Sequence, residues 1–349
     1  MKIFQSSLSY TTFEYIRKCR PDIKINLLRS YDNDNEETLK IIHDFKDNIN
    51  SKILDSGVWS KYNDPINHNH TVEDYALFLK QHADKFDIYF NYDEDFQETE
   101  KDDFSSKNRD NQKFLEDAGF KPVPVLHLLD DDEVKYYLEQ KSKYPFVAMG
   151  SNSISDKRFA GVVKQFYDEK VKVHAFKMGS YKKLRNLHVY SSDCSSHARW
   201  TAVGRCIFFN HEEELKFIAE CKARLGTKIK LTPKCKVEKT VAFNKYQKNG
   251  KENKYYFQWN KFKDIFIKFS RKVTNIEFTD LLNDSNARTY SNSIYYWWLE
   301  RYLTLLHFDI GIDFEDDPFL NENLCSFKNA LSFGEKSELD EFVDELISD

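Results

Sequence analysis

The chain has 349 residues, of which 40% are hydrophobic and 31% charged, and its net charge at neutral pH is −5. This length allows one large α/β domain with an extension, or two domains, and the hydrophobic content excludes a globally disordered chain. No apolar run approaches the roughly 20 residues of a membrane span, and residues 1–5 lack the apolar stretch of a signal peptide. We therefore expect a cytoplasmic protein without a membrane partner, in the host cytoplasm if a phage encodes it.

The first 194 residues alternate between short apolar segments and amphipathic ones. The predicted strands cover residues 2–4, 23–28, 52–55, 87–93, 122–127, 146–150, 172–179 and 188–194. The predicted helices between them cover residues 10–19, 36–49, 71–86, 109–118, 132–141, 158–169 and 181–185. Eight strands joined by helical crossovers favour a closed (β/α)8 TIM-type barrel, and the alternative is a doubly wound parallel sheet.

Helix caps can be assigned at three of these boundaries. Thr11 or Thr12 is the expected N-cap of the first helix. Thr71 and Asp74 have the spacing of a capping box, and Gly119 is suited to end the helix before it.

The alternation of short apolar and amphipathic segments ends near residue 210, and the sequence becomes rich in lysine and aromatic residues. We predict a catalytic barrel over residues 1–210, and a Lys/aromatic-rich extension with C-terminal helices over residues 211–349 that packs on the barrel. Within the extension, the patterns predict helices at 211–225, 293–308 and 337–347 and an extended segment at 228–243.

A strongly basic segment lies in this extension. Between Lys222 and Lys272 there are 16 Lys and Arg residues but only three acids, and aromatic residues are interleaved with the lysines. Lysines neutralise phosphates and aromatic rings stack on unpaired bases, so a nucleic-acid partner is predicted, and a solvated Lys-rich face is the alternative. The candidate contact residues are Arg199, Trp259, Lys261, Lys263 and Lys268.

The six cysteines are scattered and form no C-x-C or C-x-x-C motif. We expect free thiols in a reducing compartment and no zinc site. His68 and His70 lie in a predicted loop and are not expected to bind a metal.

Two aspartates stand where a predicted strand turns into a run of small residues. Asp55 is followed by Ser56-Gly57, and Asp193 by Cys194-Ser195-Ser196. In a barrel, functional residues sit at the carboxyl ends of the strands. The other residues predicted at these ends are Asp93, His127, Gly150, and His174 or Lys177, which together make a polar rim. The alternative role for such an Asp is to accept loop N–H bonds.

These segments resemble the queuine/archaeosine tRNA-guanine transglycosylase superfamily, and most of all its phage and bacterial relatives that put 7-deazaguanines into DNA. The resemblance covers about Lys52 to Trp200, through Asp55-Ser56-Gly57, Asn91-Tyr92-Asp93, residues 109–127, Val147-Ala148-Met149-Gly150, Val173-His174-Ala175-Phe176 and Ser192-Asp193-Cys194-Ser195. The family's zinc motif is absent, its glycine-rich loop is reduced to Gly150-Ser151-Asn152, and His127 stands where the tRNA enzymes have a glutamine. These departures favour DNA over tRNA.

The resemblance implies exchange of guanine for a free 7-deazaguanine base, with no cofactor. Asp193 would be the nucleophile that holds a covalent sugar intermediate, and Asp55 the general acid and base. Asp93 would accept hydrogen bonds from the N1–H and exocyclic amine of the base.

Further residues could bind the base. Trp59 could stack on it, Ser56 could orient it, and Gly150 could let the backbone approach it. His127 and His174 could hydrogen-bond the base or the sugar. Each has an ordinary alternative: a core Trp, a loop cap, a turn glycine, or a histidine satisfied by the fold.

Three other functions stay open. The same exchange could act on tRNA, the same acids could serve a hydrolytic nucleosidase or DNA glycosylase, or the barrel could be a non-enzymatic nucleic-acid-binding protein. Two acids at different strand ends favour an enzyme, and the basic segment disfavours a hydrolase of small sugars. The sequence does not predict an oligomeric state.

Overall fold

The computed structural model describes residues 1–31, 35–94, 106–150, 155–209, 238–243, 245, 250–253, 255–309 and 312. The chain divides into a barrel unit, Lys2–Arg199, and a C-terminal unit, Trp200–Asp349 together with Met1. The boundary expected at residue 210 therefore lies earlier in the chain. The reason is that β9 (Arg205–Phe209) pairs antiparallel with β10 (Glu238–Ala242), a strand of the C-terminal unit. The helices predicted at 211–225 and 337–347 lie outside the described residues.

The barrel unit is built on eight parallel strands in the order β4-β3-β2-β1-β8-β7-β6-β5. They are β1 (Lys2–Ser6), β2 (Ile25–Ser30), β3 (Ile49–Asp55), β4 (Ile88–Tyr89), β5 (Val125–Leu126), β6 (Phe146–Met149), β7 (Lys172–Ala175) and β8 (Ser191–Cys194). The two edges of the sheet meet at a parallel bridge between Phe90 and Val123. The predicted (β/α)8 TIM-type fold is confirmed, and the doubly wound alternative is wrong.

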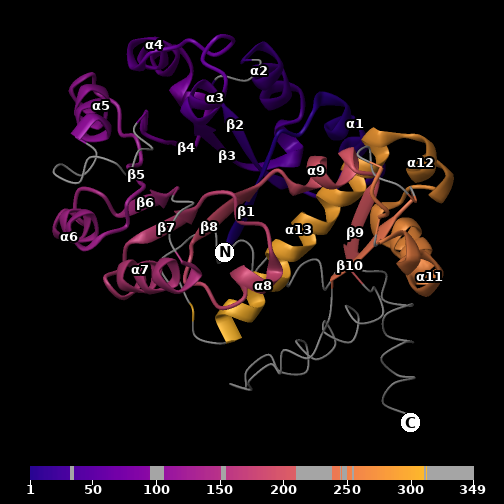
Figure 1. Cartoon of the computed structure of the whole chain (residues 1–349). Helices are drawn as coiled ribbons and strands as arrows, with labels where there is room; N and C mark the ends of the chain where they lie inside the picture. Colours follow the sequence, from indigo (N-terminus) through magenta and orange to yellow (C-terminus); the bar gives the residue numbers. More distant parts are fainter. Residues whose placement is uncertain are drawn as a thin grey trace. The chain divides into compact units, whose positions relative to one another are not determined.

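Each strand of the sheet is followed by at least one helix. The helices are α1 (Tyr10–Cys19), α2 (Asn35–Asp44), α3 (Val58–Asn63), α4 (Val72–His82), α5 (Ser106–Asp117), α6 (Asp131–Glu139), α7 (Asp156–Asp168), α8 (Tyr181–Leu184) and α9 (Ser196–Ala202), with short 3-10 turns η1 (Lys46–Asn48) and η2 (Ala83–Lys85). Helices α2 to α7 lie around the outside of the curved sheet (Figure 1). The sequence patterns did not predict α3. This helix begins directly after Gly57, whose own backbone is left-handed (φ +80°).

The helix caps follow the expected chemistry at two boundaries and differ at a third. Thr71 and Asp74 form the predicted capping box of α4, and Gly119 (φ +91°) follows α5. At α1 the N-cap is Ser9, whose hydroxyl accepts a hydrogen bond from the backbone N–H of Thr12. The prediction of Thr11 or Thr12 was wrong because Ser9 has the extended backbone of a cap and both threonines are helical.

The interior of the barrel is filled by side chains from successive strands. Phe4, Leu28, Ile53, Phe90, Val125 and Ala148 form one buried cluster, and Phe176 packs against it. Their burial on the inner face fixes the register of the strands, since a shift by one residue would turn each of them outward. The same register sets which residues reach the carboxyl rim.

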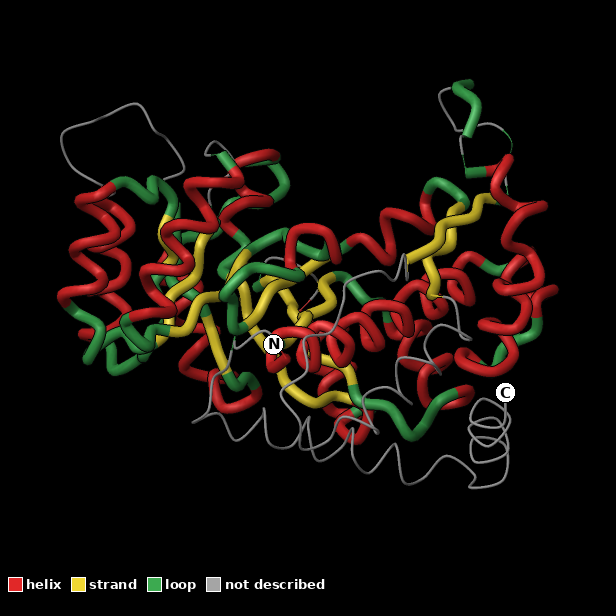
Figure 2. Tube along the Cα trace, turned by 90° about the horizontal axis from the view of Figure 1, so that it is seen from below, coloured by secondary structure: helices red, strands yellow, loops and turns green. Residues whose placement is uncertain are grey.

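The C-terminal unit holds β9 and β10 together with helices that follow them. These are η3 (Tyr256–Gln258), α11 (Trp259–Phe269), η4 (Ser270–Thr274), α12 (Phe278–Asn283) and the long α13 (Ser285–Asp309). Figure 2 draws all the described helices of the chain in red and the strands in yellow. Asn292 on α13 accepts a hydrogen bond from the backbone N–H of Ile207 (2.8 Å) and donates to the carbonyl of Arg205 (3.2 Å). This buried amide joins α13 to the edge of β9.

Cys19, Cys194 and Cys206 are free and buried, as expected, and the other three cysteines lie outside the described residues. In the described part of the chain, no helix combines the length and apolarity that crossing a bilayer requires.

Candidate active site

Three carboxylates meet at the carboxyl rim of the barrel. Asp55 ends β3, Asp93 follows β4, and Asp193 lies within β8. Although they are far apart in the sequence, Asp93 and Asp193 are both close enough to Asp55 to raise the pKa of its carboxyl group. The structure therefore brings together the three acids that were predicted to form the site.

The proton affinity of the Asp55 carboxyl group is strongly changed by its surroundings at this rim. Burial, the negative charge of Asp93 and then that of Asp193 raise its pKa to about 7. The N–H of Ser56 and the ammonium of Lys177 oppose this shift. A carboxyl group with a pKa near neutrality can both give and take a proton, which is the property of a general acid and base.

Asp93 is held by two side chains. Its Oδ1 accepts a hydrogen bond from the Ser56 hydroxyl (2.8 Å), and its Oδ2 lies 2.9 Å from Nε2 of His127. Each carboxylate oxygen has a second lone pair, so Asp93 can still accept bonds from a ligand. Ser56 and His127 thus orient Asp93, whereas the sequence had suggested that they touch the base.

His127 is positioned from two sides. Its backbone N–H donates to the carboxylate of Glu133 (3.2 Å), which also accepts a bond from the N–H of Leu129 (2.7 Å). A Cβ at Gly150 would stand 2.9 Å from Cε1 of the His127 ring, a distance that real side chains do not adopt. Gly150 therefore makes room for the His127 ring. This packing is enough to explain a glycine at position 150, and no contact with a ligand is needed to explain it.

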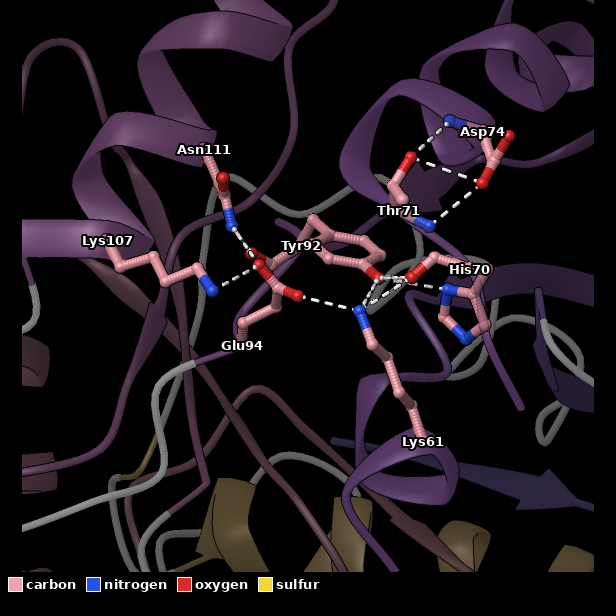
Figure 3. A network of polar contacts seen from close by, with 8 residues as sticks. All are labelled: Lys61, His70, Thr71, Asp74, Tyr92, Glu94, Lys107 and Asn111. Atoms are coloured by element: carbon pink, nitrogen blue, oxygen red, sulfur yellow. Dashed lines mark hydrogen bonds and ion pairs between the residues drawn. The ribbon is translucent and has the colours of Figure 1, made fainter. Parts of the chain in front are cut away.

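A polar network fixes the loop that carries Asp93 (Figure 3). The Lys61 ammonium on α3 donates to Oε1 of Glu94 (2.8 Å), to the Tyr92 hydroxyl (3.2 Å) and to the carbonyl of His70 (2.7 Å). From α5, the Asn111 amide donates to the carbonyl of Tyr92 (2.8 Å). The residues on both sides of Asp93 are anchored in this way, which limits how far its carboxylate can move.

Asp193 receives a backbone hydrogen bond. The N–H of Lys177 donates to its Oδ1 at 2.7 Å. Nε2 of His174 lies 3.6 Å from the same oxygen, too far for a hydrogen bond, while Nδ1 of His174 is 2.9 Å from the Ser191 hydroxyl. His174 has no exposed surface and packs against Phe90, so it lies behind Asp193. This burial is inconsistent with the predicted contact between His174 and the substrate.

Trp59 stands at the edge of this rim on α3. It is 39% exposed, so the alternative of a core tryptophan is wrong. The Lys177 ammonium lies over its ring, 3.4 Å from the centroid. The Trp59 ring therefore lines the site, and this lysine, which the sequence placed at the rim only as an alternative to His174, lies over it. The Tyr62 ring is also stacked on Trp59, with centroids 5.9 Å apart.

The predicted nucleic-acid contacts fall in different environments. Lys261, Lys263 and Lys268 are exposed on α11, as is Arg199 on α9. Trp259 is half-buried and its ring stacks on Phe278 (centroids 5.2 Å apart, planes at 15°). A predicted base stack on Trp259 is not supported, because Phe278 occupies one face. The part of the basic segment before residue 238 lies outside the described residues.

Sequence reasoning missed Glu133 and Lys61, and it placed Lys177 at the rim only as an alternative to His174. Asp130 and Glu133 have the spacing of a helix N-terminus with a capping box, which was a usable signal for Glu133. Lys177 has a left-handed backbone (φ +56°) that nothing in its residue type indicates. Lys61 acts through a tertiary contact, which no local pattern encodes.

The described residues contain no group of three or more His, Cys, Asp or Glu side chains arranged to hold a metal ion. No family model matches the chain, and neither the curated proteins nor the solved structures yield a match.

Proposed function

We propose that this protein is a transglycosylase that exchanges guanine in DNA for a 7-deazaguanine base. The observation that carries the proposal is the convergence of Asp55, Asp93 and Asp193 at one barrel rim, with the pKa of Asp55 raised to about 7. The motif resemblance described above supplies the identity of the base and favours DNA over tRNA.

The proposed reaction begins with Asp193. Its carboxylate attacks C1′ of the target nucleotide, and the bond between C1′ and the guanine N9 breaks. Asp55 in its acid form gives its proton to the leaving guanine, so the products are neutral guanine and a covalent aspartyl-sugar ester. The Lys177 N–H bond to Oδ1 of Asp193 orients the attacking group.

The second half-reaction reverses these roles. Asp55, now ionised, takes the N9 proton of the incoming 7-deazaguanine, N9 attacks C1′, and the ester bond to Asp193 breaks. Two inversions give net retention at C1′. Asp93, held by Ser56 and His127, accepts hydrogen bonds from the N1–H and amine of either base.

The target base must leave the duplex to reach a barrel rim. The exposed Trp59 ring stands at this rim, but the Lys177 ammonium lies over it and the Tyr62 ring is stacked on it, so a flipped base would meet its free edge and not an open face. Exposed cations on α11 would contact the phosphates.

The test uses purified protein, a guanine-containing DNA duplex or a tRNA, and a set of free 7-deazaguanines. Nucleoside mass spectrometry of the polymer should detect the deazaguanine nucleoside in DNA, with release of free guanine. Incorporation into tRNA alone would replace the substrate but keep the reaction. Abasic sites without incorporation would identify a hydrolytic glycosylase. If both the DNA and the tRNA are recovered unchanged, the proposal is refuted.

A further inference from the structure

We infer that Lys177 is a positioning residue for Asp193, and that its stacking on Trp59 holds it in place. The inference rests on the proposed function for the role of Asp193, but the contact between the three residues is a property of the fold. Neither Lys177 nor its contact with Trp59 is needed to explain the barrel.

The backbone of Lys177 is in a conformation that lysine rarely adopts. Its φ is +56°, in the left-handed region that favours glycine. Such a residue persists only where its surroundings hold it, and it is most informative next to a functional group. Here the N–H that this conformation directs donates to Oδ1 of Asp193 at 2.7 Å.

The side chain of Lys177 supplies the second restraint. Its ammonium lies 3.4 Å from the centroid of the Trp59 ring, a close cation–π contact. Trp59 is on α3, directly after the loop of Asp55 and Ser56, whereas Lys177 follows β7. The contact therefore ties the turn after β7 to the opposite acidic loop.

Charge gives the ammonium a further effect on the site. Asp193, Asp55 and Asp93 all attract the Lys177 cation, although partial burial lowers its pKa overall. The same cation opposes the rise in the pKa of Asp55. Removing it should therefore raise the pKa of Asp55 further as well as loosen Asp193.

The first experiment needs no substrate. In protein labelled with ¹⁵N-lysine, the Lys177 amide signal is assigned by its disappearance in Lys177→Met. We expect this amide to exchange slowly with solvent, because it is bonded to a carboxylate, and to exchange at least about tenfold faster in Trp59→Ala. Lys182→Met, a change of an exposed lysine on α8, is the control that leaves the signal unaltered. An amide equally protected in Trp59→Ala overturns the inference whether or not the protein is a transglycosylase.

The second experiment is a double-mutant cycle on formation of the covalent adduct with DNA. Lys177→Met should slow adduct formation by about 10- to 100-fold with little change in DNA affinity. It should also shift the alkaline limb of the pH profile to higher pH, because the Lys177 cation no longer lowers the pKa of Asp55. Lys177→Arg, which keeps a cation over the ring, should stay within a few-fold of wild type. Trp59→Ala also removes the ring wall, but adding Lys177→Met to it should cost much less than Lys177→Met costs alone, because only the charge of the ammonium is then still lost. Independent, multiplicative losses would overturn the inference and leave the transglycosylase proposal standing.

Discussion

Oδ2 of Asp93 lies 2.9 Å from Nε2 of His127, which joins the loop after β4 to the residue that follows β5. The position of the His127 ring depends in turn on the absence of a side chain at Gly150. We predict that Gly150→Ala displaces this ring and weakens binding of the free base about tenfold, because Asp93 is left with one of its two supports. Base affinity can be measured by titration calorimetry.

The matched control for this change is Gly161→Ala. Gly161 lies within α7 and has no atom near the position of an added Cβ. Alanine there should raise stability by up to about 1 kcal/mol through helix propensity and leave base binding unchanged. Equal affinity of both variants would show that the Gly150–His127 contact does not serve the site.

The second prediction concerns the pH dependence of stability. The pKa of Asp55 is about 7 in the folded protein, compared with an ordinary value of 3.8. Between these values the folded state binds more protons than the unfolded state, so stability falls as the pH rises through this window. Asp55→Asn removes this decrease, and its advantage over wild type in urea unfolding should grow from pH 5 to about pH 8. A constant difference would mean that the carboxyl group titrates normally.

Asp55→Asn should also stop base exchange, since the amide can neither give nor take the proton. In wild type, release of guanine in a single turnover should slow above about pH 7, where Asp55 gives up its acid form. A pH-independent rate across this range would assign the proton transfer to another group.

The third prediction concerns Asp193. Asp193→Asn keeps an oxygen that can accept the Lys177 N–H, so it should fold normally and form no covalent adduct with DNA on denaturing gels. Asp87→Asn is the control, because Asp87 precedes β4 and accepts bonds from Ser51 and Lys52 at the opposite end of the strands. Adduct formation by Asp193→Asn would move the nucleophile elsewhere.

The fourth prediction concerns the lysines of α11. If Lys261, Lys263 and Lys268 neutralise phosphates, their joint replacement by Gln should weaken DNA binding and flatten the slope of log affinity against log salt, by about 0.7–0.9 for each phosphate that is no longer neutralised. All three are exposed, so the fold should survive. Fluorescence anisotropy at several salt concentrations measures the slope, and an unchanged slope would identify an ordinary solvated face.

Trp259 leads to a different expectation. Its ring packs with Phe243, Phe266 and Phe278. We predict that Trp259→Ala costs about 1–3 kcal/mol of stability, because this packing is removed, and leaves the salt slope of DNA binding unaltered. Thermal unfolding measures the first effect, and a selective drop in DNA affinity in a fully stable variant would restore the stacking role.

The sequence was sufficient for the fold because the strands and helices alternate with clear periods. Asp55 and Asp193 could be found because each ends an apolar segment in a run of small residues. Their convergence then follows from the parallel sheet, in which the carboxyl ends of all strands meet at one rim.

The supports of the site could not be predicted in the same way. His127 and His174 look alike in the sequence, each near the end of a short apolar strand, but one ring pairs with Asp93 and the other is buried behind Asp193. The difference depends on how far each strand reaches and on neighbours such as Gly150. Trp259 was misjudged for a related reason, because an aromatic residue among lysines can equally belong to a small core.

The shortest strand pairing of the barrel, between β4 and β5, lies beside the proposed active site. Strands β4 and β5 are two residues long each, and among the described residues their edges meet at the Phe90–Val123 bridge. The contact between Asp93 and His127 joins the ends of the same two strands at the rim, and so helps to keep the barrel closed there. Local opening of the barrel would begin here, and it would separate Asp93 from the histidine that orients it before any other strands separate. Heat or denaturant should consequently abolish base recognition while most of the sheet is still intact.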